Sequence, residues 1–176
     1  MSTSVKVIKP YLYPEDYLTT QQLSFEERDN DWAFLVLDQK IQSNIQPLPI
    51  VVDCPNLNKF IGIYGYSKDK MDLDVPNLYI YGMVGPYKLY QQNTNSNVVL
   101  TYQLDTFTGQ SGSPIILYLG QSREAIIGVH SAGDYNSNFN IGSRLTTYKM
   151  NIVNMYLSQQ FGEKLSFTSI NPQNER

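Results

Sequence analysis

Short apolar runs alternate with polar turn residues along most of the chain, a pattern typical of β-strands. The runs are rich in Val, Ile and Tyr, and Gly, Asn, Asp or Pro stands in the gaps between them. They cover residues 33–37, 60–66, 78–84, 98–102, 115–119 and 125–129. Because no helical pattern separates these runs, the sequence predicts an all-β fold in which antiparallel strands form a sandwich or a barrel.

One segment near the C-terminus has helical periodicity instead. Thr146 or Thr147 can cap its start and Gly162 can end it, so we expect an amphipathic helix over 147–162 that packs on the β unit. A polar, frayed tail is expected over 163–176. The apolar positions that recur every three or four residues are Met150, Val153, Leu157 and Phe161.

A proline-rich stretch interrupts the strand pattern in the first half of the chain. Residues 42–58 contain three prolines and lack clear alternation of apolar and polar positions. We therefore predict that 47–57 is a linker between an N-terminal unit, 1–46, and a larger β unit, 58–146.

Composition excludes several classes of function. Thirteen basic and 16 acidic residues give a net charge of −3 without any run of Lys or Arg, so neither nucleic acid nor an anionic membrane is an expected partner. No stretch has the length of a membrane span and the N-terminus lacks the apolar region of a secretion signal. We expect a soluble protein, and its compartment and oligomeric state stay open.

The residues that bind metals are scarce. One cysteine, Cys54, and one histidine, His130, are too few for a zinc or iron–sulfur site or for a disulfide. The acidic cluster Asp69, Asp72 and Asp74 lacks the glycine and the glutamate of a calcium-binding loop, and a solvated hairpin tip explains it. We expect no metal and no other cofactor, and Cys54 is interpreted as a small buried hydrophobe.

The segment 105–114 (DTFTGQSGSP) carries the clearest chemistry. A serine between glycines, Ser111, can expose its hydroxyl on a tight turn, and the amides of Gly109 and Ser111 can point together at a developing oxyanion. These are the requirements of acyl transfer, although a plain Gly/Ser hairpin loop has the same residues. The lipase-type pattern Gly-x-Ser-x-Gly is not met, because Ser113 stands at its last position.

Two further segments complete a recognisable order. Residues 30–37 (NDWAFLVL) place Asp31 directly before an apolar strand, and residues 127–133 (IGVHSAG) place His130 at a strand end. Together with 105–114 they resemble the chymotrypsin-like serine peptidases, most closely the glutamyl endopeptidase, or V8 protease, branch. Segments 64–69 and 140–146 also resemble that branch, so the likeness spans about Asp29 to Phe161.

The resemblance implies a fold of two antiparallel barrels with the active site between them and a helix at the C-terminus. Residues 1–46 would be the remnant of an incomplete first barrel, and 58–146 the full second barrel. Asp31 would be the orienting carboxylate, Ser111 the nucleophile, and Gly109 with Ser111 the oxyanion donors. Without the other motifs, Asp31 would be interpreted as a strand-entry carboxylate.

The same resemblance implies a peptide or protein substrate. Ser131, Ala132 and Gly133, otherwise a plain turn, would pair with the substrate as an added strand. In the glutamyl branch the counterparts of His130 and Thr106 bind the carboxylate of a substrate Glu. Asp105, six positions before Ser111, stands where trypsin-like relatives hold Lys or Arg, so the residues disagree. We favour cleavage after Glu or Gln over cleavage after a basic residue.

The family pattern fails at the general base. In this family the base is a histidine that lies before the aspartate, and no residue before Asp31 is His. His130 follows Ser111 and would break the family order. We therefore expect that the chain alone is nearly inactive. Two explanations are open: an upstream segment carries the base, or the chain is a pseudo-peptidase that binds peptides without cutting them. We favour the upstream segment. A structural or lectin-like β-sandwich would require all three motifs to be coincidental.

Gln110 marks a second departure from the wider family. Chymotrypsin has an Asp at this position, which receives the new N-terminus after zymogen cleavage. Because Gln110 carries no charge, the sequence predicts that this activation device is absent.

Overall fold

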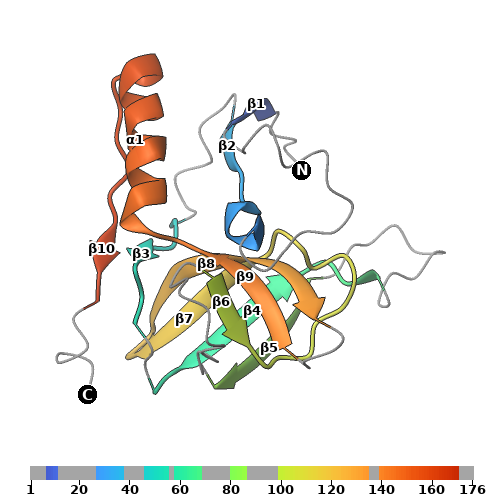
Figure 1. The fold of residues 1–176 in the computed structure, drawn as a ribbon. Helices are drawn as coiled ribbons and strands as arrows, with labels where there is room; N and C mark the ends of the chain where they lie inside the picture. Colours follow the sequence, from blue (N-terminus) through green and yellow to red (C-terminus); the bar gives the residue numbers. More distant parts are fainter. Residues whose placement is uncertain are drawn as a thin grey trace.

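A six-stranded antiparallel sheet forms the centre of the protein (Figure 1). The computed structural model describes residues 7–11, 27–37, 46–55, 58–68, 80–86, 99–134 and 139–170. In the sheet the strands lie in the order β5–β4–β7–β8–β9–β6, so sequence neighbours pair as hairpins except where β4 joins β7 and β9 joins β6. The strands are β4 (Phe60–Gly65), β5 (Tyr81–Pro86), β6 (Val99–Tyr102), β7 (Pro114–Gly120), β8 (Arg123–Asp134) and β9 (Phe139–Arg144).

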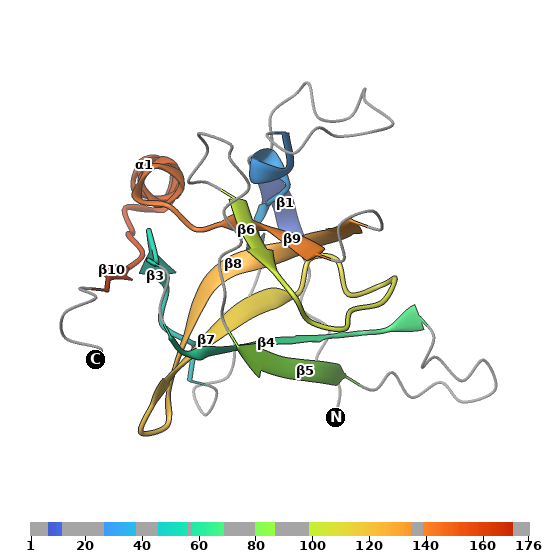
Figure 2. The ribbon, with the colours of Figure 1, turned by 60° about the horizontal axis from the view of Figure 1, so that its bottom comes forward.

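The sheet curls on itself (Figure 2). Its strands share one buried apolar core. The largest fully buried side chains of these strands are aliphatic or aromatic: Ile61, Ile63, Leu100, Tyr102, Ile115, Leu117 and Ile127. Gly142 lies so close to this core that an added Cβ would stand 2.4 Å from the Ile115 side chain. The all-β prediction and the strand pattern are therefore confirmed.

Helix α1 (Thr147–Phe161) follows the sheet and begins and ends where the sequence predicts. Thr146 caps it by accepting a hydrogen bond from the Lys149 amide at 3.2 Å, and Gly162 ends it with φ of 70°. Phe161, expected on the apolar face, is instead half exposed and contacts Tyr156 edge-on, because it is the last helical residue. No helix within the described residues is long and apolar enough to cross a membrane.

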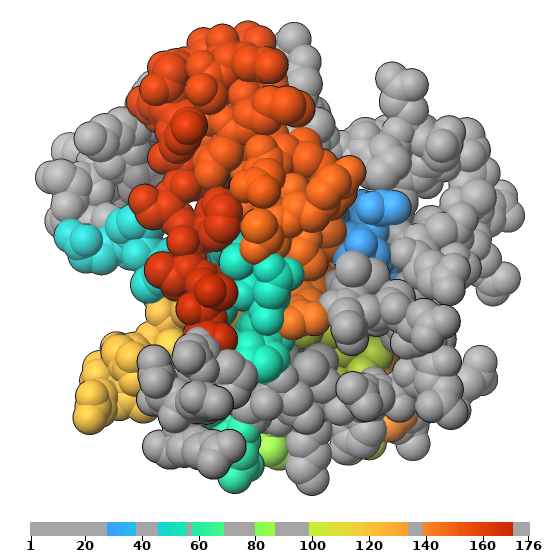
Figure 3. Space-filling model, turned by 60° about the vertical axis from the view of Figure 1, so that its left-hand side comes forward, coloured from blue at the N-terminus to red at the C-terminus, as the bar shows by residue number. Residues whose placement is uncertain are grey.

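The segment predicted to be a linker is largely packed. It contains the short strand β3 (Val51–Val52), which is buried and pairs in parallel with β10 (Thr168–Ser169). Leu165 and Phe167 also pack against the cluster that holds α1, and Figure 3 shows the red C-terminal segment lying against the segment with β3. The frayed tail expected from 163 is therefore wrong for 163–170, because β3 and the α1 cluster give this segment partners that are distant in sequence.

The N-terminal unit contributes a two-stranded antiparallel sheet and one turn of 3₁₀ helix. Strand β1 (Val7–Tyr11) pairs antiparallel with β2 (Phe34–Leu37) in a separate two-stranded sheet. A 3₁₀ helix, Glu27–Asn30, leads into β2 and lies next to β9. In Figure 3 this blue segment is in contact with the orange segment of β9 and the start of α1.

A buried lysine joins the N-terminal unit to the rest of the molecule. Lys149 is 3% exposed and forms an ion pair with the Asp29 carboxylate. Its ammonium group also donates to the Asp29 carbonyl at 2.7 Å, to Ser143 Oγ at 2.9 Å and to the Arg144 carbonyl at 2.9 Å. Burial lowers the pKa of Lys149, and the Asp29 carboxylate opposes that shift. The charge is thus surrounded by acceptors from two elements, as buried charges require.

We expect Lys149→Met to lower the free energy of unfolding by about 2–4 kcal/mol. The substitution removes the cation and leaves the Asp29 carboxylate charged, largely buried and unpaired. The measurement is the midpoint of urea unfolding. Lys164→Met, at an exposed position beyond α1, is the matched control and should change stability by less than about 0.5 kcal/mol. Equal midpoints for the two variants would contradict the anchoring role of Lys149.

Candidate active site

The loop before β7 holds Ser111 in a conformation that two glycines permit. Gly109 has φ of 100° and Gly112 has φ of 85°, values that side chains rarely adopt. A Cβ at Gly109 would also stand 2.7 Å from the Tyr66 carbonyl oxygen, so both backbone angle and space require glycine there. Ser111 is exposed at the tip of this loop.

Gln110 holds the loop from inside. Its side chain is 4% exposed; Oε1 accepts from the Phe107 amide at 2.8 Å, and Nε2 donates to the Tyr81 carbonyl on β5 at 3.4 Å. The Ser113 amide donates to the Gln110 carbonyl at 3.0 Å.

Among the described residues, no carbonyl or side chain accepts from the amides of Gly109 and Ser111. These two amides are thus available to an incoming oxygen.

Backbone hydrogen bonds join this loop to β8. The Gly112 amide donates to the His130 carbonyl at 2.8 Å, and the His130 amide donates to the Ser113 carbonyl at 2.8 Å. The Ser111 hydroxyl donates to the Ser131 carbonyl at 2.9 Å. The serine loop and the end of β8 therefore form one hydrogen-bonded unit.

Asp31 reaches the same unit from the N-terminal side. Its amide donates to the Arg28 carbonyl at 3.2 Å, so the last turn of the 3₁₀ helix sets its position. The Ser131 hydroxyl donates to Asp31 Oδ2. Asp31 and Ser111 thus both contact Ser131. Asp31 binds the Ser131 hydroxyl, and Ser111 binds the Ser131 carbonyl.

His130 is buried and hydrogen-bonded to Tyr102. It is 3% exposed, and its Nδ1 lies 2.6 Å from the hydroxyl of Tyr102, which is fully buried. Burial keeps the pKa of Tyr102 well above 10, so the hydroxyl has a proton to donate, and Nδ1 is the acceptor that the described residues offer. Nδ1 therefore accepts, and Nε2 carries the hydrogen of a neutral ring.

The same burial keeps that ring uncharged. Burial lowers the pKa of His130 from 6.5 to about 4, and the nearby Asp31 carboxylate offsets only part of the shift. At neutral pH the His130 ring is therefore a hydrogen-bond donor without a positive charge.

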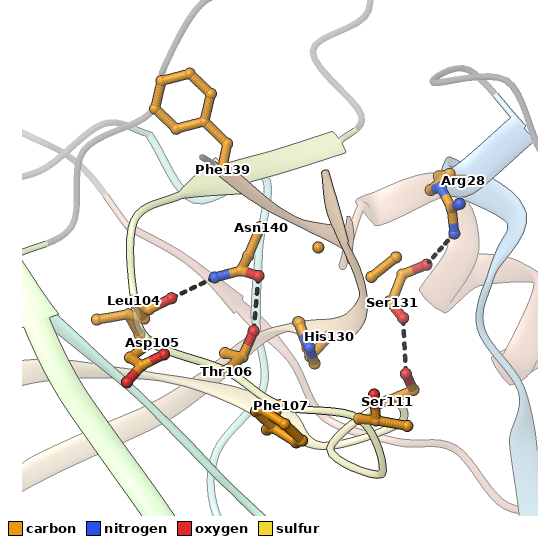
Figure 4. A pocket seen from close by; sticks show the side chains of 13 residues that line it. Arg28, Leu104, Asp105, Thr106, Phe107, Ser111, His130, Ser131, Phe139 and Asn140 are labelled. Carbon is orange, nitrogen blue, oxygen red and sulfur yellow. Dashed lines mark hydrogen bonds between the residues drawn. The ribbon is translucent and has the colours of Figure 1, made fainter. Parts of the chain in front are cut away.

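A pocket of about 590 Å³ opens beside these groups (Figure 4). Every substrate-binding residue predicted from the sequence lines it: Asp105, Thr106, His130, Ser131, Ala132 and Gly133. Ser111 stands at its edge, whereas Asp31 and Gly109 are not part of its lining. The residues that sequence reasoning did not single out are Arg28, Leu104, Phe107, Thr108, Phe139 and Asn140.

Polar groups fix one end of the pocket. Thr106 Oγ1 donates to Asn140 Oδ1 at 2.7 Å, and Asn140 Nδ2 donates to the Leu104 carbonyl. Asp105 lines the same end and is exposed, so water solvates its charge. Arg28 lies at the other end, where its Nη1 donates to Ser131 Oγ at 3.4 Å.

No metal site is found among the residues that the structure describes, where no three His, Cys, Asp or Glu side chains gather. The acidic cluster Asp69, Asp72 and Asp74 lies outside the described residues. Cys54 is a free, fully buried thiol.

The fold matches known serine peptidases, although no family model and no curated protein matches the sequence. A Glu endopeptidase in complex with MPD superposes with a TM-score of 0.67 and 25% identity, covering 89% of this chain and 66% of the other. A thermostable serine protease, AL20, from an extremophilic microorganism gives a TM-score of 0.53 and 20% identity, with 76% and 60% covered. The chain thus spans less than two thirds of the length of either protein.

The chain has the chymotrypsin-like serine peptidase fold, as the motifs predicted. The similarity to Glu endopeptidase relates it to the glutamyl endopeptidase branch.

The neutral state of His130 makes stability depend on pH. Its pKa is about 4 in the folded protein and 6.5 when unperturbed, so its contribution to stability is fully present above pH 6.5 and is lost as pH falls from 6.5 to 4. We expect a loss of about 3 kcal/mol over that range. In His130→Gln the loss should be smaller, because glutamine can still accept from Tyr102 and does not titrate.

Urea unfolding of both proteins at several pH values between 7.5 and 4 measures this difference. Because carboxylates titrate alike in the two proteins, parallel curves would show that His130 is not held neutral.

Proposed function

We propose that this chain carries the nucleophile and the substrate-binding groups of a serine endopeptidase that acts on peptides. The observation that supports the proposal most directly is the position of Ser131. It accepts a hydrogen bond from the Ser111 hydroxyl and donates one to the Asp31 carboxylate, at the edge of a pocket. A nucleophile and an orienting carboxylate on either side of a shared residue suit the geometry of a Ser–base–Asp triad.

In this proposal Ser111 Oγ attacks the carbonyl carbon of the scissile bond. The carbonyl oxygen becomes negatively charged, and the amides of Gly109 and Ser111 stabilise it. The serine proton passes to a base and then to the departing amine, which leaves as the acyl-enzyme forms. Water later releases the acyl group by the reverse sequence. Each step requires a base between Ser111 and Asp31.

His130 does not suit the role of that base. Its Nδ1 accepts from Tyr102, its pKa is about 4, and the Ser111 hydroxyl donates to the Ser131 carbonyl rather than to an imidazole. The sequence contains no other histidine. We infer that the chain alone is nearly inactive and that a full reaction needs an imidazole from outside these residues.

A catalytically dead peptide-binding module is the second candidate function. The hydrogen bond from Ser111 to the Ser131 carbonyl favours it, because the hydroxyl is engaged in a contact that does not activate it. Both candidates share the peptide-binding edge at Ser131, Ala132 and Gly133, and they differ in whether Ser111 can react.

The pocket suits Glu or Gln before the scissile bond. The His130 Nε2 hydrogen is a neutral donor that can bind either a carboxylate or an amide oxygen. The Thr106 hydroxyl donates its hydrogen to Asn140 Oδ1, so it can accept from the amide of a Gln. Asp105 opposes an acidic side chain, but its exposure to water weakens that repulsion. The similarity to Glu endopeptidase also supports this specificity.

We expect a fluorophosphonate probe to label Ser111 slowly, and free imidazole to accelerate the labelling at least about tenfold by occupying the position of the missing base. Asp31→Asn should remove most of the acceleration, because Asp31 would orient the imidazole. The measurement is the rate of probe attachment, followed by peptide mass spectrometry with and without imidazole.

Ser122, an exposed serine in the turn between β7 and β8, is the internal control, and its labelling should stay at background. If imidazole left the rate of probe attachment to Ser111 unchanged, the result would contradict the proposed endopeptidase function and favour the peptide-binding module. Fast labelling without imidazole that disappears in His130→Ala would show that His130 is the base.

Peptides ending in Glu, Gln or Lys as C-terminal amides should bind with different affinities. We expect Glu and Gln to bind several times more tightly than Lys, and His130→Ala to weaken Glu and Gln about equally, because the lost donor is neutral. Asp105→Ala should strengthen Glu binding. Calorimetric titration measures these affinities, and circular dichroism checks that each variant is folded. A preference for Lys that Asp105→Ala abolishes and His130→Ala leaves intact would overturn the Glu/Gln assignment.

A further inference from the structure

The charge in the pocket does not come from the histidine. Three of its lining residues can carry charge, and His130 is neutral because burial lowers its pKa to about 4. Asp105 and Arg28 remain, and they lie at opposite ends (Figure 4). Among the described residues that line the pocket, Arg28 is therefore the one that carries a positive charge at neutral pH.

Arg28 also has hydrogen-bonding capacity to spare. A guanidinium has five N–H donors, and within the described residues Arg28 uses one of them, in a long bond of 3.4 Å to Ser131 Oγ. The side chain is half-buried and lines the pocket, so it is desolvated in part and accessible to a ligand. A planar group of this kind binds a carboxylate through two parallel hydrogen bonds.

The position of Arg28 beside Ser131 indicates which part of a peptide it meets. The pairing of β8 with β9 shifts register between His130 and Ala132, so the simple alternation of side chains does not apply at Ser131. Arg28 contacts the Ser131 hydroxyl, and Figure 4 shows it at the end of the pocket away from Asp105 and Thr106. In a peptide strand paired with Ser131–Gly133, neighbouring side chains point to opposite sides, so the side chain next to the one at the His130 end is directed away from that end.

We propose that Arg28 is a specificity-determining residue that binds an acidic side chain of the peptide. That residue directly precedes the one whose side chain enters the His130 end of the pocket. The proposal rests on the proposed peptide-binding function and adds a second position that the site reads. The His130 end selects a peptide side chain by its hydrogen-bonding groups, and the Arg28 end selects the preceding side chain by its charge.

The test uses the full chain and two pairs of short acetylated peptide amides, Ala-Val-Glu-Gln against Ala-Val-Gln-Gln and Ala-Val-Ala-Glu against Ala-Val-Ala-Gln. NMR titration gives the affinities and follows the Arg28 Nε–H resonance. We expect the first pair to differ by about 3–10-fold in favour of Glu, as one partly exposed charge-assisted pair allows. The difference should shrink in high salt.

Arg28→Gln should abolish the preference within the first pair and leave the second pair unchanged. Arg28→Lys should keep part of it, because the charge remains while the planar fork is lost. The matched control Lys164→Gln removes the same charge at an exposed site beyond α1 and should change neither pair.

Three outcomes would overturn the proposal, and they are distinguishable. A first-pair preference that survives Arg28→Gln, or binding with no preference, would remove the role of Arg28 and leave peptide binding intact. An effect of Arg28→Gln confined to the second pair would show that Arg28 reads the other position. Failure of every peptide to bind would remove both this proposal and the proposed function.

Discussion

Ser131 is the residue on which the candidate site depends. Its hydroxyl donates to Asp31, its carbonyl accepts from Ser111, and Arg28 donates to the same hydroxyl. Because one residue makes all three contacts, the relative positions of the acid, the alcohol and the guanidinium are set by the end of a single strand, β8. A strand in the middle of a six-stranded sheet is among the more rigid supports that a site can have.

The contact between Ser131 and Asp31 in turn requires that the N-terminal unit be held against the sheet. Lys149 does this from the first turn of α1 by binding both the carboxylate and the carbonyl of Asp29, two positions before Asp31. Ser143 of β9 supports the same carbonyl with a hydrogen bond of 2.7 Å. The segment with Asp31 is thus attached through these polar groups, and Trp32 and Phe34 beside it also pack against the apolar cluster at α1.

Local sequence patterns predicted the elements whose determinants are local. The strands follow from alternation, α1 follows from its period with Thr146 and Gly162 at its ends, and the loop around Ser111 follows from its glycines. What failed depends on partners distant in sequence. The predicted linker is packed because β3 pairs with β10, more than a hundred residues later.

The same distinction applies within the candidate site. The motifs pointed to Ser111, Asp31 and the pocket residues, which recur in a family order. Lys149 was missed because a lysine at the start of a helix normally faces water, although it stands one turn before the buried Val153. Arg28 was missed because nothing in its sequence neighbourhood shows that the 3₁₀ helix lies next to β9 and brings Arg28 to Ser131.

The side chain of Gln110 determines which solution conditions affect the attachment of the serine loop. In a loop fastened by an ion pair, acid or concentrated salt weakens the fastening, and a newly cut chain end can switch it on. Here the fastening consists of hydrogen bonds between neutral groups, from the Phe107 amide to Gln110 and from Gln110 to Tyr81. The attachment of the loop at Gln110 therefore responds less to acidity and ionic strength than an ion pair at the same place would.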